Sequence, residues 1–238
     1  MTESAVPKRA YRHRLPTRIW HWTNAVTVFV MIGSGLMISN AHPHLYWGVY
    51  GANFDQPWFD PPRFPGWLTI PSRYNLALAR RWHLLFALVL AFNLLWFMIA
   101  SLLNRHFTRD LRFRREELRP AAIARDVREH LAFRFHDGEN PARFNLLQKI
   151  AYCAALFVLL PVIILTGLGL SPGWNAGAPW ILDLFGGRQS VRSIHFIACW
   201  GVVAFVVVHL VLVILAGPFA EIRSMLTGWF VPPKGEER

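Results

Sequence analysis

Long apolar stretches alternate with polar and aromatic-rich segments along the chain. Four of them, at about 19–38, 82–103, 147–170 and 191–216, hold the roughly 20 apolar residues that span a bilayer. Their apolar positions are continuous, which argues against the alternating strands of a membrane β-barrel. The pattern predicts an all-α integral membrane protein, a four-helix bundle. The alternative for the first stretch is a cleaved secretory signal, but the stretch is long for one and contains His21 and Asn24.

The segments between these spans predict one membrane domain over residues 1–238. Residues 39–81 form an outer loop rich in Trp, Pro and Gly, a composition typical of the membrane interface. Residues 104–146 form a cytoplasmic loop, in which residues 118–135 have helical apolar spacing and predict an amphipathic surface helix. Residues 219–231 are too short and polar for a fifth span.

Composition and charge agree with a membrane protein. Of 238 residues, 54% are apolar and 16% charged, against the about 25% charged residues of soluble proteins. Nineteen of the 25 Lys and Arg lie before residue 19, between 104 and 149, or after 216. The positive-inside rule therefore places both termini in the cytoplasm, as in a multi-pass protein of the bacterial inner membrane. The net charge of +11 then needs no nucleic acid, although a basic patch for RNA or DNA is the rival explanation.

Four of the ten His lie within the apolar spans, where an ionisable side chain is costly and indicates a functional site. The alternative for any one of them is a hydrogen bond to a neighbouring helix. Because successive spans run in opposite directions, their depths match in pairs: His83 with His195 near the outer face, and His21 with His209 near the inner face. Fourteen residues separate His195 from His209, which is about 21 Å along a helix and about 40° around it, so they share one face.

Paired His on facing helices match the two axial ligands of a b haem. Zinc needs further Cys, Asp or Glu ligands, which the spans do not offer in suitable places, and copper would leave the space between helices unexplained. Glycines and alanines in the spans leave room for a flat ring, or alternatively permit close helix packing. The chain has no C-x-x-C-H motif for covalent haem. We therefore expect two haems b with His21, His83, His195 and His209 as iron ligands.

Cationic side chains near the span ends are candidate partners for anionic haem propionates. Arg80, Arg81 and Arg192 are nearest the outer pair and run against the positive-inside bias. Their alternative role is snorkelling at a helix end. The inner-side candidates are Arg18, Lys149 and Arg223. Asp and Glu are absent from all four spans, which argues against a proton pump or transporter.

Several motifs resemble those of bacterial di-haem b-type cytochromes. They are Arg18-Ile19-Trp20-His21-Trp22-Thr23-Asn24-Ala25, Arg81-Trp82-His83, Asn145-Leu146-Leu147-Gln148-Lys149 and Gly186-Gly187-Arg188-Gln189-Ser190, together with His195 and His209. Over nearly its whole length the chain is similar to the cytochrome b-561 and nickel-hydrogenase cytochrome b group, which includes the formate dehydrogenase gamma subunit. The resemblance implies four helices around two b haems, with the same two axial pairs. It also implies a quinone site beside the inner haem, with Trp22, Asn24, Gln148, Lys149 and Tyr152 as candidates.

Three functions are compatible with this sequence. The first is an electron-transfer subunit between the quinone pool and a periplasmic redox partner; the long outer loop is similar to that of members that accompany molybdopterin oxidoreductases. The second is a self-contained oxidoreductase that passes electrons from superoxide to quinone, with the outer arginines as a cationic funnel. The third is a non-redox transporter. Partners are therefore membrane lipid, quinone and a periplasmic protein, and the sequence leaves homo-oligomerisation open.

Overall fold

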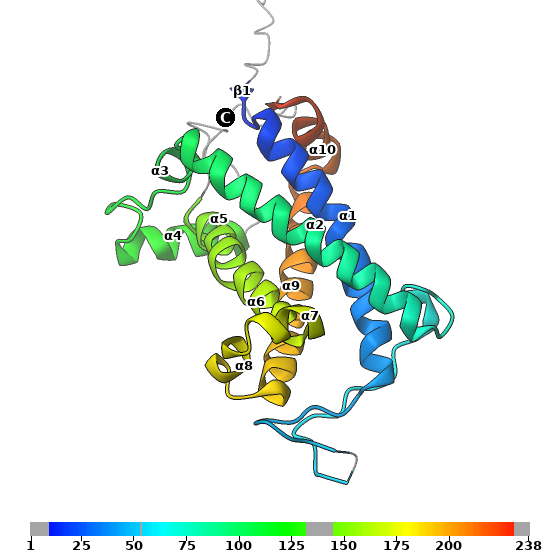
Figure 1. The fold of residues 1–238 in the computed structure, drawn as a ribbon. Coiled ribbons are helices and arrows are strands. Elements are labelled where there is room, and N and C mark those ends of the chain that lie inside the picture. Colours follow the sequence, from blue (N-terminus) through cyan, green and yellow to red (C-terminus); the bar gives the residue numbers. More distant parts are fainter. Residues whose placement is uncertain (1–9, 53, 132–144, 231–238) are drawn as a thin grey trace, which may run out of the picture. The chain divides into compact units, whose positions relative to one another are not determined.

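Four long helices dominate the computed structural model, which describes residues 10–52, 54–131 and 145–230 (Figure 1). They are α1 (Leu15–Ala41), α2 (Leu76–Leu103), the run formed by α5 (Leu146–Ala154), η2 (Ala155–Leu159) and α6 (Leu160–Leu170), and α9 (Arg188–Leu215). Each is long and apolar enough to cross a membrane, and at most 28% of its most apolar window is buried within the protein. Their exposed faces carry large apolar side chains such as Phe29, Leu85 and Val208. Such faces suit contact with lipid, and the four predicted spans are confirmed.

The third span contains a π-helical segment, η2, immediately before α6. Pro161 lies in the first turn of α6 and has no backbone N–H, and its ring would clash with the carbonyl of Phe157 in a regular α-helix. A wider π turn relieves this clash while the helix continues. The proline therefore reshapes the span without ending it.

Short elements connect the spans. The loop after α1 contains the turn η1 (Gly66–Leu68), and the loop after α2 contains α3 (His106–Asp110) and α4 (Pro120–Leu131). The predicted amphipathic helix corresponds to α4, although its expected last residues lie outside the described ones. Two short helices, α7 (Pro172–Gly177) and α8 (Trp180–Leu184), connect α6 to α9. The described chain ends with α10 (Pro218–Thr227) and β2 (Trp229–Phe230), which pairs with β1 (Ala10–Tyr11).

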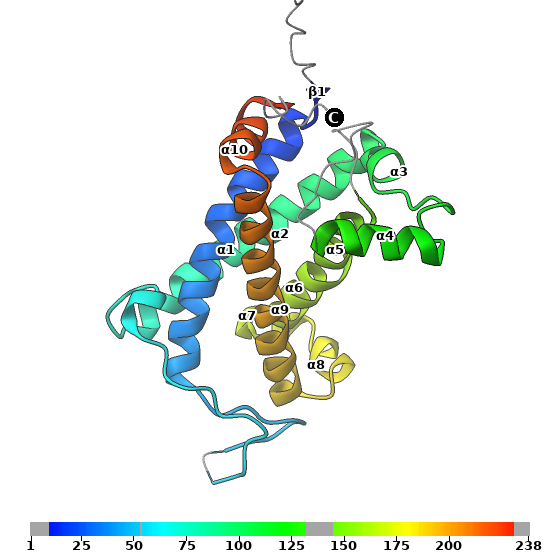
Figure 2. The ribbon, with the colours of Figure 1, turned by 180° about the vertical axis from the view of Figure 1, so that it is seen from behind.

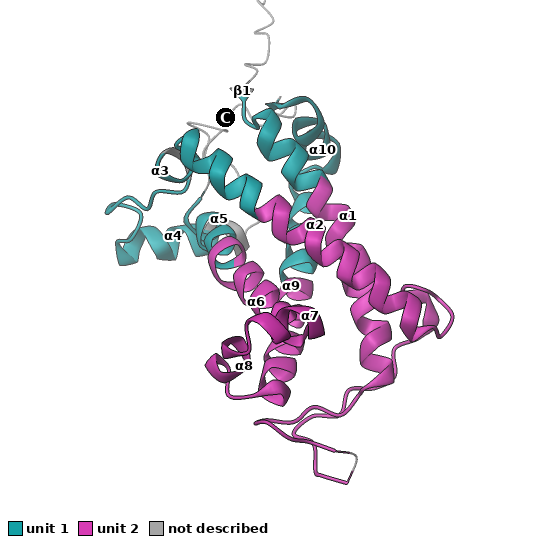
Figure 3. Cartoon of the chain, viewed as in Figure 1, with its two compact units in different colours: residues 1–22, 95–154, 205–238 teal, residues 23–94, 155–204 magenta. Residues whose placement is uncertain are grey.

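The chain divides into two compact units, each built from segments that are far apart in sequence (Figure 3). Unit 1 comprises residues 1–22, 95–154 and 205–238, and unit 2 comprises residues 23–94 and 155–204. Helices α1, α2 and α9 each contribute residues to both units. His21 and His209 belong to unit 1, whereas His83 and His195 belong to unit 2.

In unit 1, the first and last described segments of the chain pair with each other. Besides the β1–β2 pairing, the guanidinium of Arg12 forms an ion pair with Glu221 of α10 at 3.3 Å. Arg18 and the indole N–H of Trp22 both donate to the Met225 carbonyl, at 3.4 and 3.3 Å. This carbonyl lies in the last turn of α10, where backbone acceptors lack helical partners. These contacts hold α10 beside the first turns of α1 (Figure 2).

His13 lies at the same junction and is nearly buried, with 9% of its surface exposed. Burial, followed by the nearby Arg12 guanidinium, lowers the pKa of His13 from 6.5 to about 4. The folded junction therefore stabilises the neutral form of the His13 ring. When the junction opens, the ring regains an ordinary pKa and binds a proton more readily.

We expect acid to open this junction. The stability contributed by neutral His13 is complete above pH 6.5, falls as the pH drops toward 4, and changes no further below that. At pH 5 the opened state should gain roughly 30-fold in population relative to pH 8. Hydrogen exchange at the Arg12 and His13 amides, which both donate to the Gly228 carbonyl, measures this opening. In His13→Gln the extra pH dependence should disappear; if it persists, another group controls the junction.

In unit 2, the loop after α1 is fastened to the start of α9. The amides of Gln189 and Ser190 donate to the Gly48 carbonyl at 3.0 and 3.2 Å, and the Gly48 amide donates to the Ser190 hydroxyl at 2.7 Å. Gly187, just before α9, has a φ of +105°, and a Cβ there would lie 2.7 Å from the Gly48 oxygen. Only glycine fits this close approach. The loop is therefore an ordered part of unit 2.

Candidate functional site

Each unit contains one pair of facing histidine rings, and both pairs are those predicted. In unit 1, His21 of α1 and His209 of α9 have ring centroids 6.2 Å apart, with ring planes at 63°. In unit 2, His83 of α2 and His195 of α9 have centroids 6.2 Å apart, with planes at 67°. The structure thus brings together the four histidines in two nearly equivalent arrangements.

This spacing fits a metal ion held between the two rings of each pair. A metal–nitrogen bond is about 2 Å long, and ring bonds of about 1.35 Å put each nitrogen about 1.2 Å from its ring centre. Two imidazoles bound to opposite sides of one metal ion therefore have centres about 6 Å apart, close to the observed 6.2 Å. Among the described residues, no group of three or more His, Cys, Asp or Glu is arranged to hold a metal ion. Two protein nitrogens per site match the axial requirement of a haem.

The surroundings of the unit 1 pair are aromatic. The ring of Trp22 meets His21 edge-on, with centroids 5.1 Å apart, and the ring of Phe205 lies parallel to His209 at 6.0 Å. The Nδ1 atom of His21 is buried and has no hydrogen-bond partner among the described residues. Aromatic packing therefore surrounds these rings.

The unit 2 pair is surrounded by hydroxyls and glycines. The hydroxyl oxygen of Ser34 in α1 lies 3.0 Å from His83 Nδ1, and that of Thr166 in α6 lies 2.9 Å from His195 Nδ1. Both hydroxyl residues are fully buried. Neither was predicted as a site residue, since serine and threonine are common in membrane helices and carry no metal-ligand signal by themselves.

The predicted propionate partners on the outer side make different contacts. The guanidinium of Arg192 donates to the His42 carbonyl. Burial, followed by the positive charges of Arg192 and then Arg80, lowers the pKa of His42. Arg80 and Arg81 are exposed in the first turns of α2. All three arginines belong to unit 2, the unit that contains the His83–His195 pair.

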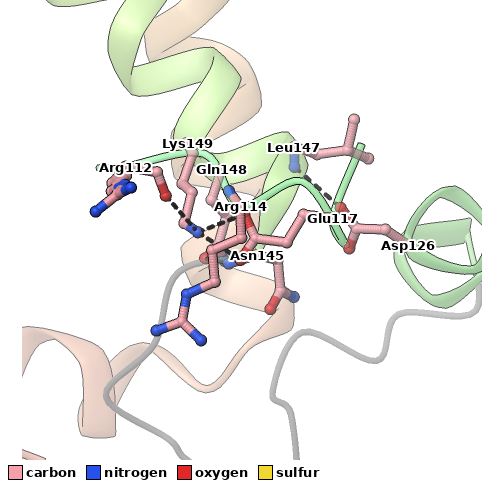
Figure 4. Close-up of polar contacts among 8 residues, drawn as sticks. All are labelled: Arg112, Arg114, Glu117, Asp126, Asn145, Leu147, Gln148 and Lys149. Carbon is pink, nitrogen blue, oxygen red and sulfur yellow. Dashed lines mark hydrogen bonds and ion pairs between the residues drawn. The ribbon is translucent and has the colours of Figure 1, made fainter. Parts of the chain in front are cut away.

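On the predicted cytoplasmic side, Lys149 is already paired within unit 1 (Figure 4). Its ammonium donates to the two Glu117 carboxylate oxygens at 2.7 and 2.8 Å, and to the Arg112 carbonyl at 3.3 Å. Only 4% of the Lys149 side chain is exposed. This pairing gives Lys149 a structural role at the start of α5. Arg18 likewise contacts α10, as described above.

The quinone candidates differ in their contacts. The side-chain oxygen of Gln148 accepts a hydrogen bond from the backbone amide of Asn145 at 3.2 Å (Figure 4). This contact is half of a capping box at the start of α5. Trp22 contacts α10, and Tyr152 is half-buried in α5. Asn24, in unit 2, is buried, and neither atom of its side-chain amide has a hydrogen-bond partner among the described residues. Among the quinone candidates, Asn24 therefore has the side chain best able to form hydrogen bonds with a ligand.

Comparison with known proteins agrees with this geometry. The family model for prokaryotic cytochrome b561 matches residues 12–228. The chain belongs to the prokaryotic cytochrome b561 family. It is therefore a membrane b-type cytochrome, an electron-transport protein, and the predicted four-helix membrane fold is confirmed. Family membership also favours a redox function over the non-redox transporter.

Relatives of this cytochrome are named as subunits of two kinds of complex. A putative protein-methionine-sulfoxide reductase subunit, YedZ1, of Azospira oryzae is 31% identical over 83% of this chain and 87% of its own length. A probable Ni/Fe-hydrogenase B-type cytochrome subunit of Cupriavidus necator is 25% identical over 93% of this chain and 87% of its own length. A similarly named subunit of Azotobacter vinelandii is 26% identical over 92% of this chain and 87% of its own length. No solved structure matches the chain.

Proposed function

We propose that this cytochrome is the electron-transfer subunit of a membrane redox complex, and that it carries electrons between the quinone pool and a periplasmic partner. The observation that carries the proposal is the pair of facing imidazoles in each unit, with ring centroids 6.2 Å apart in both. His83 and His195 would hold one haem b, and His21 and His209 a second. When bound, these groups supply one-electron oxidation and reduction.

The chain's own residues have distinct roles in this proposal. The four imidazoles bind and orient the haems, and the apolar side chains of the spans exclude water from them. Arg80, Arg81 and Arg192 provide positive charge for propionates in unit 2, and Arg18 provides it in unit 1. Lys149 is the weaker candidate because its ammonium is already neutralised by Glu117.

The proposed topology is a single membrane domain over residues 1–238, with both termini in the cytoplasm. All four spans contribute to both compact units, which supports one domain. The excess of Lys and Arg at the termini and in the loop after α2 supports the orientation. In this orientation the His83–His195 unit belongs to the periplasmic half, next to the ordered loop that contains Gly48.

We propose a reductase of the molybdopterin type as the periplasmic partner. The relative named as a methionine-sulfoxide reductase subunit is 31% identical to the chain, whereas the named hydrogenase subunits are 25–26% identical. The ordered loop after α1, fastened to α9 through Gly48, supplies a rigid surface for docking. A quinone would bind toward the start of α1, where Asn24 offers a buried side-chain amide with no hydrogen-bond partner among the described residues.

Quinol-driven reduction of the bound haems tests this function. The chain is purified in lipid nanodiscs, oxidised, and mixed with a short-chain quinol while the b-haem absorbance is followed. We expect reduction of both haems in the wild type and none from quinol when both His21 and His209 are replaced by alanine. Quinone reduction by the isolated chain with superoxide as the donor would instead favour the self-contained oxidoreductase.

The partner is tested in membranes that contain the whole complex. Vesicles from cells with and without this chain are assayed for quinol-dependent reduction of methionine sulfoxide and for hydrogen-dependent reduction of quinone. A chain-dependent rate with methionine sulfoxide that is lost in a host unable to make molybdopterin supports the proposal. A chain-dependent rate with hydrogen alone would assign the cytochrome to a hydrogenase.

A further inference from the structure

Two helices of unit 2 present the same six-residue pattern to the two rings of the His83–His195 pair. Residues 30–35 read Val-Met-Ile-Gly-Ser-Gly in α1, and residues 162–167 read Val-Ile-Ile-Leu-Thr-Gly in α6. In each, a hydroxyl residue is followed directly by glycine. The hydroxyl contacts one ring nitrogen, and the glycine packs against the same ring.

The contacts agree closely between the two copies. The Ser34 hydroxyl lies 2.7 Å from the Val30 carbonyl, 3.2 Å from the Met31 carbonyl and 3.0 Å from His83 Nδ1. The Thr166 hydroxyl lies 2.7 Å from the Val162 carbonyl, 3.2 Å from the Ile163 carbonyl and 2.9 Å from His195 Nδ1.

The glycines complete the pattern. A Cβ at Gly35 would lie 3.4 Å from His83 Cε1, and a Cβ at Gly167 would lie 3.4 Å from His195 Cε1. A Cβ at either position would be in van der Waals contact with the ring. Each ring is therefore seated against helix backbone that carries no side chain at the point of contact.

This arrangement defines which ring nitrogen carries the proton. A hydroxyl has one hydrogen, which each of these donates to the carbonyl four residues earlier, so its oxygen accepts from the ring. Nδ1 therefore carries the hydrogen, and Nε2 keeps the lone pair that a metal requires.

We propose that Ser34 and Thr166 are positioning residues that fix the tautomer and orientation of His83 and His195, and that their hydroxyls lower the reduction potential of the haem held between these rings. The proposal rests on haem binding by this pair, as proposed above. A hydrogen bond accepted from Nδ1–H makes the imidazole a stronger electron donor, which favours ferric over ferrous iron. The hydroxyls accept strongly because each donates its own hydrogen to a carbonyl. Ser34 and Thr166 contact the rings of the unit 2 pair, whereas His21 Nδ1 in unit 1 has no hydrogen-bond partner among the described residues, so we expect the effect at the haem of unit 2.

Thr166 offers the sharpest test, because valine removes the hydroxyl at nearly constant volume and serine retains it. In spectroelectrochemical titration of the purified cytochrome, Thr166→Val should raise the reduced-to-oxidised ratio of one haem about threefold at a given potential. Combined with Ser34→Ala it should raise that ratio about tenfold, or about 59 mV for one electron. The other haem should keep its potential, and Thr166→Ser should restore the wild-type value.

Thr27→Val is the matched control, since Thr27 is a buried threonine of α1 whose hydroxyl has no recorded bond to either ring. Unchanged potentials in Thr166→Val and Ser34→Ala, with both haems retained, would overturn the inference. If Thr166→Val or Ser34→Ala loses a haem, the haem content of the other variants decides. Retention of both haems by Thr166→Ser and Thr27→Val supports the role of the hydroxyls. Equal loss of haem in these two variants overturns it. Retention of both haems by His83→Ala would instead contradict the proposed haem site itself.

Discussion

His83→Ala should reduce the haem content of the purified cytochrome from two haems per chain to one. In the proposed function, the two facing imidazoles of unit 2, 6.2 Å apart at their centroids, would hold one haem, and removal of either would leave that haem with a single protein ligand. The pyridine haemochrome assay measures the loss directly. His195→Ala should remove the same spectral component, since the two rings share one site. His21→Ala and His209→Ala should remove the other component.

His44→Ala is the control, because His44 lies in the loop after α1 and is paired with Asp60 at 3.2 Å. It should retain both haems. The four histidine-to-alanine variants also test the pairing, because the two members of a pair should lose the same spectral component. If His83→Ala and His21→Ala remove the same component, the pairs are wrong even though the ligands are right. Two haems in every single variant would show that the iron ligands lie elsewhere.

Glu117→Ala should destabilise the cytochrome by about 3 kcal/mol. The Glu117 carboxylate neutralises the Lys149 ammonium, whose side chain is only 4% exposed. Its removal leaves a buried charge whose remaining hydrogen-bond partner among the described residues is the Arg112 carbonyl at 3.3 Å, and isolated buried charges cost about 3–5 kcal/mol. The Glu117 side chain is 23% exposed, so solvent partly compensates and the lower end of that range applies. The free energy of unfolding can be measured by denaturing-detergent titration in mixed micelles.

Two variants separate a charge effect from a general effect of truncation. Glu116→Ala removes the neighbouring exposed acid and should change the free energy of unfolding by less than about 0.5 kcal/mol. Lys149→Met combined with Glu117→Leu replaces both charges with apolar groups and should recover most of the stability lost in Glu117→Ala. A double variant as unstable as Glu117→Ala would mean that packing, rather than the unpaired ammonium, controls stability here.

The spans and the histidine pairs could be predicted because strong physical constraints mark them in the sequence. A membrane helix needs about 20 apolar residues, so its position is visible without any tertiary information. Span direction and the helical rise then give the depth of each histidine, which is why His83 was matched with His195 and His21 with His209. The observed α1 and α2 begin at Leu15 and Leu76, before the apolar stretches, since helical structure continues past the membrane boundary.

The polar contacts of the candidate site were less predictable. The sequence suggests Gln148 as a quinone candidate, and the structure adds that its side chain caps α5 by accepting from the backbone amide of Asn145. The sequence suggests Lys149 as a propionate partner because it is a cation near a span end. Its pairing with Glu117 could not be predicted, since Glu117 is distant in sequence and reaches Lys149 only through tertiary folding. Ser34 and Thr166 share the sequence pattern Val-x-Ile-x-Ser/Thr-Gly. The pattern indicates a function only once the structure shows that each hydroxyl contacts a histidine ring.

The interleaved composition of the two units has a consequence for biosynthesis. Unit 2 ends at residue 204, so both of its histidines have emerged once α9 is half made. Unit 1 includes residues 1–22 but also requires residues 205–238, which are synthesised after all of unit 2. Because chains are synthesised from the N-terminus, His21 is made before both histidines of unit 2, whereas its partner His209 is made after them. Maturation of the cytochrome should therefore proceed from the His83–His195 centre to the His21–His209 centre.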